Sequence, residues 1–116
     1  MHEMGIAMQL VEIASAAIPG DMENIQVEKV NLKLGKLSSV VPDSLRFCFE
    51  IITKETLLAG AELCIQEIEV TARCNDCNAE WTITGPAFSC EKCKSGNITI
   101  VSGQELEISS IEIADE

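Results

Sequence analysis

Two short stretches, CNDC at residues 74–77 and CEKC at residues 90–93, decide how the middle of this chain folds. Each C-x-x-C pair can turn two sulfurs toward one point, and two pairs can close a tetrahedral shell of four thiolates. Such a shell suits zinc, at about 2.3 Å for each Zn–S bond, and it leaves no open position for a substrate. The sequence therefore predicts a structural zinc site at Cys74, Cys77, Cys90 and Cys93.

Two other interpretations of the four cysteines stay open at this stage. Two disulfides would require an oxidising compartment, but the chain opens with Met1-His2-Glu3 and shows no basic region ahead of an apolar run, so no signal peptide is evident. A rubredoxin-like iron centre would use the same four sulfurs. An iron protein of that kind would be red, whereas a zinc protein is colourless.

Length and composition limit the architecture. With 116 residues and 12.6 kDa, the chain can form one modest core and a small module that depends on metal for its stability. The 47% share of hydrophobic residues is typical of a globular protein, and no apolar stretch is long enough to cross a bilayer. We expect a cytoplasmic protein without a membrane partner.

The charge of the chain argues against a nucleic-acid partner. Nineteen acidic residues face eight basic ones, and the resulting net charge of −11 repels phosphate backbones. The cysteine-containing segment is no exception, because its basic and acidic side chains cancel (Arg73, Lys92 and Lys94 against Asp76, Glu80 and Glu91). We therefore expect no nucleic-acid partner.

Helical periodicity predicts two helices. Residues 4–18 carry a broad apolar stripe, which predicts a well-buried helix that ends at Pro19 (Met4, Ala7, Met8, Leu10, Val11, Ile13, Ser15 and Ile18). Pro42 suits the first turn of a second helix, which we expect to end at Gly60. Its buried face would carry Leu45, Cys48, Phe49, Ile52 and Thr56.

Alternating apolar residues predict strands over 25–34 and 63–72, each with a shift of register, a short strand over 80–84, and strands from 98 to 113 that Gly103 interrupts. The order of elements predicts an α+β fold with two helices packed on one face of a three-stranded sheet. The four-cysteine zinc ribbon is an insertion in it. The expected domains are residues 1–72 plus 97–116, and the zinc-binding module 73–96.

The start of the chain offers a second metal site. His2 is the only histidine, and its imidazole, its amide nitrogen and the terminal amine of Met1 can chelate one ion, with the amide or carboxylate of Glu3 as a fourth donor. Planar nitrogen donors suit Ni(II) or Cu(II) better than zinc. A solvated, frayed chain end is the alternative that chemistry alone leaves open.

The chain resembles the HypA/HybF family of nickel metallochaperones. The resemblance spans nearly the whole chain, and the Met-His-Glu start combined with the four cysteines is its most specific part. Its other segments are LGKLSSVVP at 34–42, SLRFCFE at 44–50, GAEL at 60–63, SGQEL at 102–106 and IE at 111–112.

The resemblance implies a nickel site at Met1, His2 and Glu3, a separate structural zinc, and delivery of nickel to the large subunit of [NiFe]-hydrogenase together with the GTPase HypB. Urease maturation proteins are further candidate partners. Some members carry histidines beside the zinc cysteines. This chain has none there, which puts any ligand exchange through such histidines in doubt.

Other functions fit the sequence less well. An enzyme would need a buried general base or a nucleophile with its base, and the single terminal histidine supplies neither, so we predict that the chain is not an enzyme. A zinc-ribbon adaptor without nickel transfer is the alternative function, but it leaves the Met-His-Glu start unexplained. Cys48 and Cys64 are expected to be small buried residues, with a redox pair or a third metal site as the alternative, and Phe88 is expected to pack over the cysteines.

Overall fold

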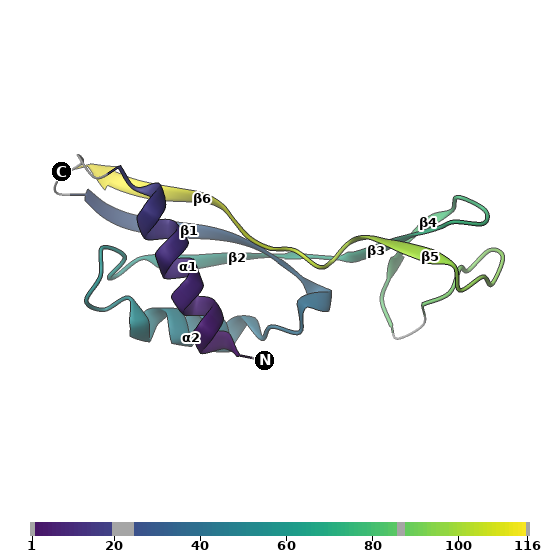
Figure 1. The fold of residues 1–116 in the computed structure, drawn as a ribbon, viewed down its shortest axis with the longest axis horizontal. Helices are drawn as coiled ribbons and strands as arrows, with labels where there is room; N and C mark the ends of the chain where they lie inside the picture. The colour runs from purple at the N-terminus through teal and green to yellow at the C-terminus, as the bar shows by residue number, and fades with distance from the viewer. Residues whose placement is uncertain (1, 20–24, 86–87, 116) are drawn as a thin grey trace. The chain divides into compact units, whose positions relative to one another are not determined.

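The computed structural model describes residues 2–19, 25–85 and 88–115 (Figure 1). The described residues form two α-helices, one 3-10 turn and six strands, and the strands make two three-stranded sheets, β2-β1-β6 and β4-β3-β5. The predicted α+β fold is confirmed, and the second sheet is an addition to it. The elements are α1 (Glu3–Ala17), β1 (Ile25–Gly35), η1 (Lys36–Ser38), α2 (Pro42–Ile52), β2 (Glu62–Ile68), β3 (Val70–Cys74), β4 (Glu80–Ile83), β5 (Ile98–Ser102) and β6 (Leu106–Asp115).

The chain divides into two compact units. The first unit contains Met1–Lys33, Ser39–Gln66 and Glu107–Glu116. The second unit contains Leu34–Ser38 and Glu67–Leu106, and the predicted zinc-binding range 73–96 lies within it. The chain passes from one unit to the other four times, so each unit contains segments that are far apart in sequence.

In the first unit, both helices pack on one face of the sheet β2-β1-β6 (Figure 1). Strands β1 and β2 run in the same direction, and α2 forms the crossover that a parallel pair requires. The predicted shift of face within β1 is confirmed, since Val27, Val30 and Leu32 are all buried. The core between the helices and the sheet also contains Leu45, Phe49 and Leu63.

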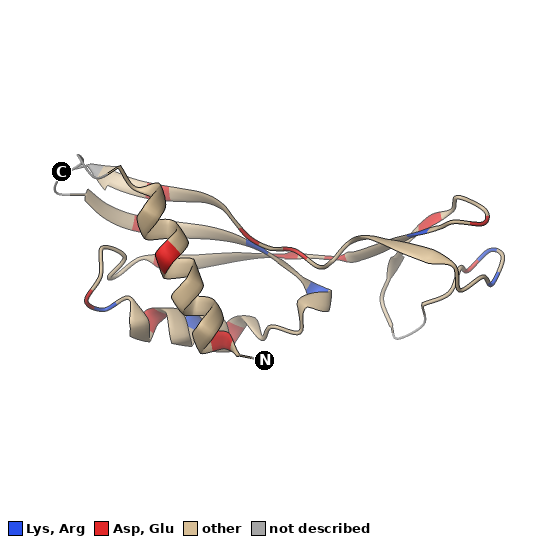
Figure 2. Ribbon diagram, in the orientation of Figure 1, with Lys and Arg blue, Asp and Glu red and all other residues tan. Residues whose placement is uncertain are grey.

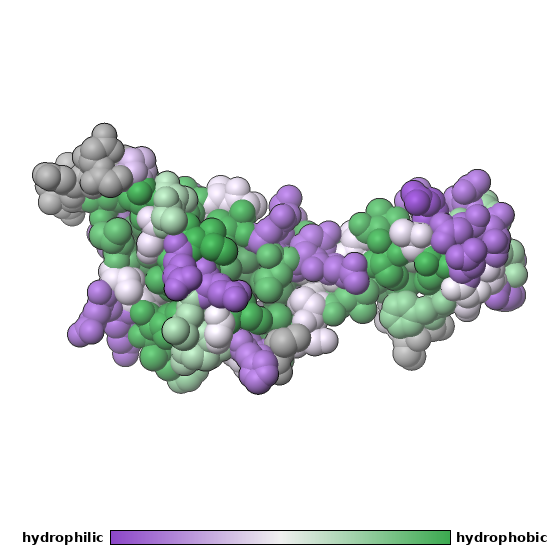
Figure 3. Space-filling view, in the orientation of Figure 1, coloured by the Kyte–Doolittle hydropathy of each residue, from purple (hydrophilic) through white to green (hydrophobic). Residues whose placement is uncertain are grey.

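Helix α1 buries a narrower stripe than its sequence suggests. Its buried residues are Ala7, Leu10 and Ala14, whereas Met4, Met8 and Ile13 are 41%, 56% and 57% exposed. The predicted helix is confirmed, but the prediction that its whole apolar stripe is well buried is wrong. Helix α1 packs against α2, and several of its long apolar side chains are left at the surface. Figure 3 shows hydrophobic surface on the helical side of this unit.

Helix α2 ends at Ile52, and the prediction that it continues to Gly60 is wrong. The Thr53 hydroxyl donates to the backbone oxygens of Phe49, at 2.8 Å, and Glu50, at 3.3 Å. A β-branched residue that hydrogen-bonds to the preceding turn favours the end of a helix. Residues 53–60 form successive turns instead, and Gly60 takes a φ of +81° there.

The register shifts predicted within the later strands are points where the chain passes from one sheet to the other. Strand β2 belongs to the first sheet and β3 to the second, with Glu69 between them, so the prediction of one strand over 63–72 is wrong. In the same way, β5 and β6 belong to different sheets on either side of Gly103.

The second unit is built on antiparallel pairing of β3 with both β4 and β5, which places Ala72 opposite Trp81 and Ile100. Its small core consists of Val70, Ala72 and Ile83. The partly buried residues Leu37, Trp81, Ile98 and Ile100 pack against this core.

Two glycines allow backbones to meet in the second unit. The Gly35 N–H donates to the Glu105 oxygen at 2.7 Å, and a Cβ on Gly35 would lie 2.1 Å from the carbonyl carbon of Gly103. Gly103 itself has a φ of +113°, and a Cβ there would lie 2.9 Å from the Cα of Val70. Both positions therefore require glycine.

Candidate metal centres

The four predicted cysteines come together at one end of the second sheet. Their Sγ atoms all lie within 4.8 Å of one another, and two pairs, Cys74 with Cys93 and Cys77 with Cys90, are 3.5 Å apart. A tetrahedral zinc with bonds of about 2.3 Å places its sulfurs about 3.8 Å apart. The cluster therefore fits a zinc ion. The pairs are too far apart for disulfides, whose sulfurs are bonded at about 2.05 Å, and all four thiols are free.

Each cysteine pair is held by the same backbone turn. The N–H groups of Asn78 and Lys94 donate to the oxygens of Cys74 and Cys90, both at 2.9 Å, and these two donors have φ values of 62° and 64°. The N–H groups of Cys74 and Cys90 in turn donate to residues five positions later, both at 2.8 Å. The two loops are thus repeats of one turn, each of which aims two sulfurs at a common point.

Side chains also join the two loops to each other. The Ser95 hydroxyl donates to the Asp76 carboxylate, and the Asn75 side chain donates to the Asn97 side-chain oxygen at 3.1 Å. The Asn75 N–H adds a bond to the Asn97 backbone oxygen at 2.9 Å. These contacts fix the spacing of the cysteine pairs independently of the sulfurs.

The thiols of the cluster differ in pKa, which is lowered for Cys90 and raised for Cys77 and Cys93. The N–H of Cys93 points at the Cys90 Sγ at 3.5 Å, and this contact is the largest cause that lowers the pKa of the Cys90 thiol to about 6. The thiolate is the form that binds a metal. Cys74 and Cys90 are buried, whereas Cys77 and Cys93 are exposed.

The predicted nickel residues lie at the start of α1. Met1 is outside the described residues, His2 is exposed immediately before the helix, and Glu3 is half-buried in its first turn. The His2 carbonyl accepts the N–H of Ile6 at 3.1 Å. The Glu3 carboxylate accepts the backbone N–H of Val41 at 3.1 Å, and this bond lowers the pKa of the Glu3 carboxyl.

Within the described part of the chain, the four cysteines are the one group of three or more His, Cys, Asp or Glu side chains close enough to hold an ion. Cys48 and Cys64 are half-buried free thiols, and burial is the largest cause that raises the pKa of Cys64. Phe88 is 44% exposed, so the structure does not show it buried against the cysteines as predicted.

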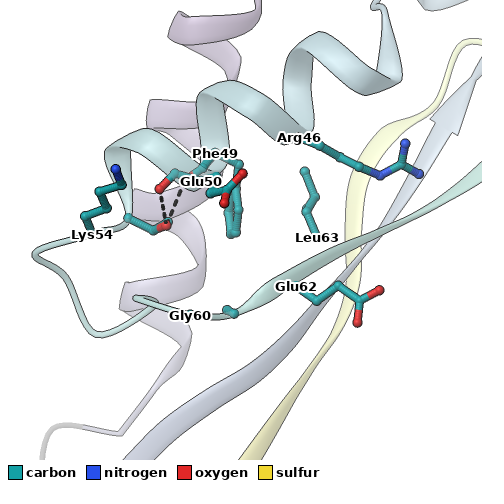
Figure 4. Close-up of a pocket in the computed structure, with 9 residues that line it drawn as sticks. Arg46, Phe49, Glu50, Lys54, Gly60, Glu62 and Leu63 are labelled. Atoms are coloured by element: carbon teal, nitrogen blue, oxygen red, sulfur yellow. Dashed lines mark hydrogen bonds between the residues drawn. The ribbon is translucent and has the colours of Figure 1, made fainter.

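A groove of about 500 Å³ lies between α2 and the start of β2 (Figure 4). Phe49 and Leu63 point into it from the two elements, and charged side chains surround them (Arg46, Glu50, Lys54 and Glu62). Its one hydroxyl, on Thr53, is bonded to backbone oxygens. The Thr53 hydroxyl is therefore already engaged within its own helix end.

Lys and Arg residues are scattered along the described ribbon, with acidic residues among them (Figure 2).

Neither described helix has the length and apolar character needed to span a membrane.

Comparison with known proteins gives a consistent result. A protein-family model described as "Hydrogenase/urease nickel incorporation, metallochaperone, hypA" matches residues 1–113. The chain is 61% identical to a hydrogenase maturation factor HypA from Desulfosudis oleivorans, over 99% of this chain and 100% of that protein. It is 59% identical to a protein of the same name from Desulfatibacillum aliphaticivorans, over 99% of this chain and 88% of that protein.

Solved structures give the same fold. The solution structure of the Ni metallochaperone HypA from Helicobacter pylori matches with a TM-score of 0.69 and 26% identity, over 100% of both chains. A second solution structure of a HypA protein matches with a TM-score of 0.71 and 27% identity, over 100% of this chain and 98% of that one.

Proposed function

Because the chain belongs to the HypA family, we propose that it is a nickel metallochaperone that binds Ni(II) at its N-terminus and delivers it to the large subunit of [NiFe]-hydrogenase during maturation. The observation that carries this proposal is the family match over residues 1–113, which includes both the Met-His-Glu start and the four cysteines. A zinc-ribbon adaptor would not account for that start.

The proposed nickel ligands are the Met1 amine, the His2 amide nitrogen and the His2 imidazole, with Glu3 completing or shaping the plane. The exposure of His2 supports a carrier role, because an ion held at an exposed chain end can be passed on without opening a core. Nitrogen donors in a plane favour Ni(II) over zinc.

The four cysteine thiolates would hold a structural zinc. Four sulfurs complete its coordination, so the zinc would support the folded second unit and take no part in nickel transfer. The two metals would then occupy separate sites made of different donors, nitrogen for the cargo and sulfur for the structural ion.

Transfer would require contact with other proteins. We propose the GTPase HypB and the hydrogenase large subunit as partners in the cytoplasm, with urease maturation proteins as further candidates, since the family description names both hydrogenase and urease. Membranes and nucleic acids are not among the proposed partners. The chain would act by binding and release, and not as an enzyme.

The decisive experiment is a nickel titration of the untagged protein beside its His2→Ala variant. We expect the variant to lose nickel binding and to keep its zinc content and its melting temperature, because His2 is exposed and lies ahead of α1. Equal nickel affinity in the two proteins would refute the N-terminal site.

A second prediction concerns the terminal amine. One extra residue before Met1 removes the amine from its chelate ring, and we expect it to weaken nickel binding about as much as His2→Ala. Because an α-amino group ordinarily has a pKa near 8, the native chelate should also bind nickel more tightly as the pH rises from about 6 to about 8. A tagged protein with unchanged affinity and no pH dependence would show that side chains alone hold the ion.

A further inference from the structure

Glu3 is tied to the start of the second helix. Its carboxylate accepts the N–H of Val41, 38 residues away, at 3.1 Å. Val41 is the N-cap residue of α2, and no side chain caps that helix in the usual way. In a capping box, a glutamate three residues into a helix accepts the N–H of its own N-cap residue. Here a glutamate from α1 accepts the equivalent N–H of α2.

The surroundings favour a negative charge at this point. Glu3 stands in the first turn of α1 and bonds to the N-cap residue of α2, so its carboxylate lies near the positive ends of two helices. The exposed His2 and the half-buried Glu3 mark the place where the chain enters the fold. The hydrogen bond therefore fixes the residue that follows His2.

We propose that Glu3 is a positioning residue for the N-terminal nickel site, whose carboxylate stays on the Val41 N–H when nickel binds and does not ligate the ion. The inference rests on the proposed nickel function and deepens it. Residues 1 and 2 already supply three nitrogens in fused rings, so the chelate does not require the carboxylate. With the Glu3 carboxylate held on Val41, the fourth position of the plane is left to the Glu3 amide nitrogen.

Two conservative substitutions separate positioning from ligation. Glu3→Gln keeps an oxygen at the same reach, which can accept the Val41 N–H, but it removes the anionic ligand. Glu3→Asp keeps the anion and shortens its reach by one methylene. We expect the Glu3→Gln variant to bind nickel as the parent does, with the same visible absorption band, whereas the Glu3→Asp and Glu3→Ala variants bind about ten-fold more weakly.

A third variant removes the donor instead of the acceptor. Val41→Pro eliminates the N–H, and the φ of −86° at Val41 and its 53% exposure mean that the substitution loses little packing. We expect it to weaken nickel binding as Glu3→Ala does. In the parent, the Val41 amide resonance in a ¹H–¹⁵N spectrum should remain at its hydrogen-bonded position after nickel is added.

Zinc content and thermal melting of every variant control for folding, and the Gln and Asp pair decides the question even if Val41→Pro does not fold. The reverse order, with Glu3→Asp near the parent and Glu3→Gln near Glu3→Ala, would make the Glu3 carboxylate a ligand and overturn this inference alone. If His2→Ala kept full nickel affinity, the proposed function itself would fail.

Discussion

Cys93 is an exposed member of the four-cysteine cluster, yet we expect its loss to remove the metal. Cys93→Ser leaves three thiolates, which cannot complete the closed tetrahedral shell of a structural zinc. Metal analysis of the purified protein should show about one zinc per chain in the parent and almost none in the variant.

Cys48→Ser is the matched control, because Cys48 is a free thiol on α2, outside the cluster. It should keep its zinc. Loss of zinc in both variants, or iron in place of zinc in the parent, would contradict the assignment.

At the scale of single residues, the sequence predicts well those contacts that follow from local turns, and it predicts poorly the contacts between residues far apart in the chain. The positions of the four cysteines follow from two local turns, so their convergence was predictable. The bond between Glu3 and Val41 joins a side chain to a backbone N–H, and an N–H belongs to nearly every residue, so no pattern in the sequence marks it. The sequence predicted Glu3 as a nickel residue, but it did not indicate that the Glu3 carboxylate bonds to Val41.

At the scale of elements, the close backbone approach at Gly103 leads to a specific stability prediction. Gly103→Ala introduces a Cβ 2.9 Å from the Cα of Val70 at a φ of +113°, and we expect it to lower the free energy of unfolding by about 3 kcal/mol. Denaturant unfolding followed by Trp81 fluorescence measures this, since Trp81 packs on the same small core.

Gly96→Ala provides the comparison for this variant. A Cβ there meets nothing within 4 Å and its φ is not positive, so its effect should stay within about 0.5 kcal/mol. Equal stability of the Gly96→Ala and Gly103→Ala variants would mean that the close approach of Gly103 to Val70 is not required.

The errors at the scale of elements have physical causes. Apolar content along 4–18 predicted a helix correctly but not which of its faces is buried, because apolar residues occur all round this helix and only the stripe of Ala7, Leu10 and Ala14 is covered. Alternation along 63–72 predicted extended chain correctly, but the sheet to which a strand belongs is decided by its pairing partners, and β2 and β3 have different ones.

For the whole molecule, the two units should respond differently to removal of the metal. Both helices belong to the first unit, whereas Trp81, the only tryptophan, belongs to the second. We expect a strong zinc chelator to change Trp81 fluorescence, as the second unit loses its metal, while the helical circular dichroism is kept.

Readdition of zinc should restore the fluorescence. Parallel loss of both signals at the same chelator concentration would show that the two units unfold as one.

The order of the segments in each unit has a consequence for a chain cut short after the second unit. Strand β1 pairs with β6, and its Asn31 side chain donates to Ser110 at 3.0 Å, so the first sheet stays two-stranded in a fragment that lacks β6. The second unit contains nothing beyond Leu106 and can be complete without that strand. A fragment that ends near residue 106 should therefore still load metal at its cysteine loops, while the open edge of β1 makes it prone to aggregation.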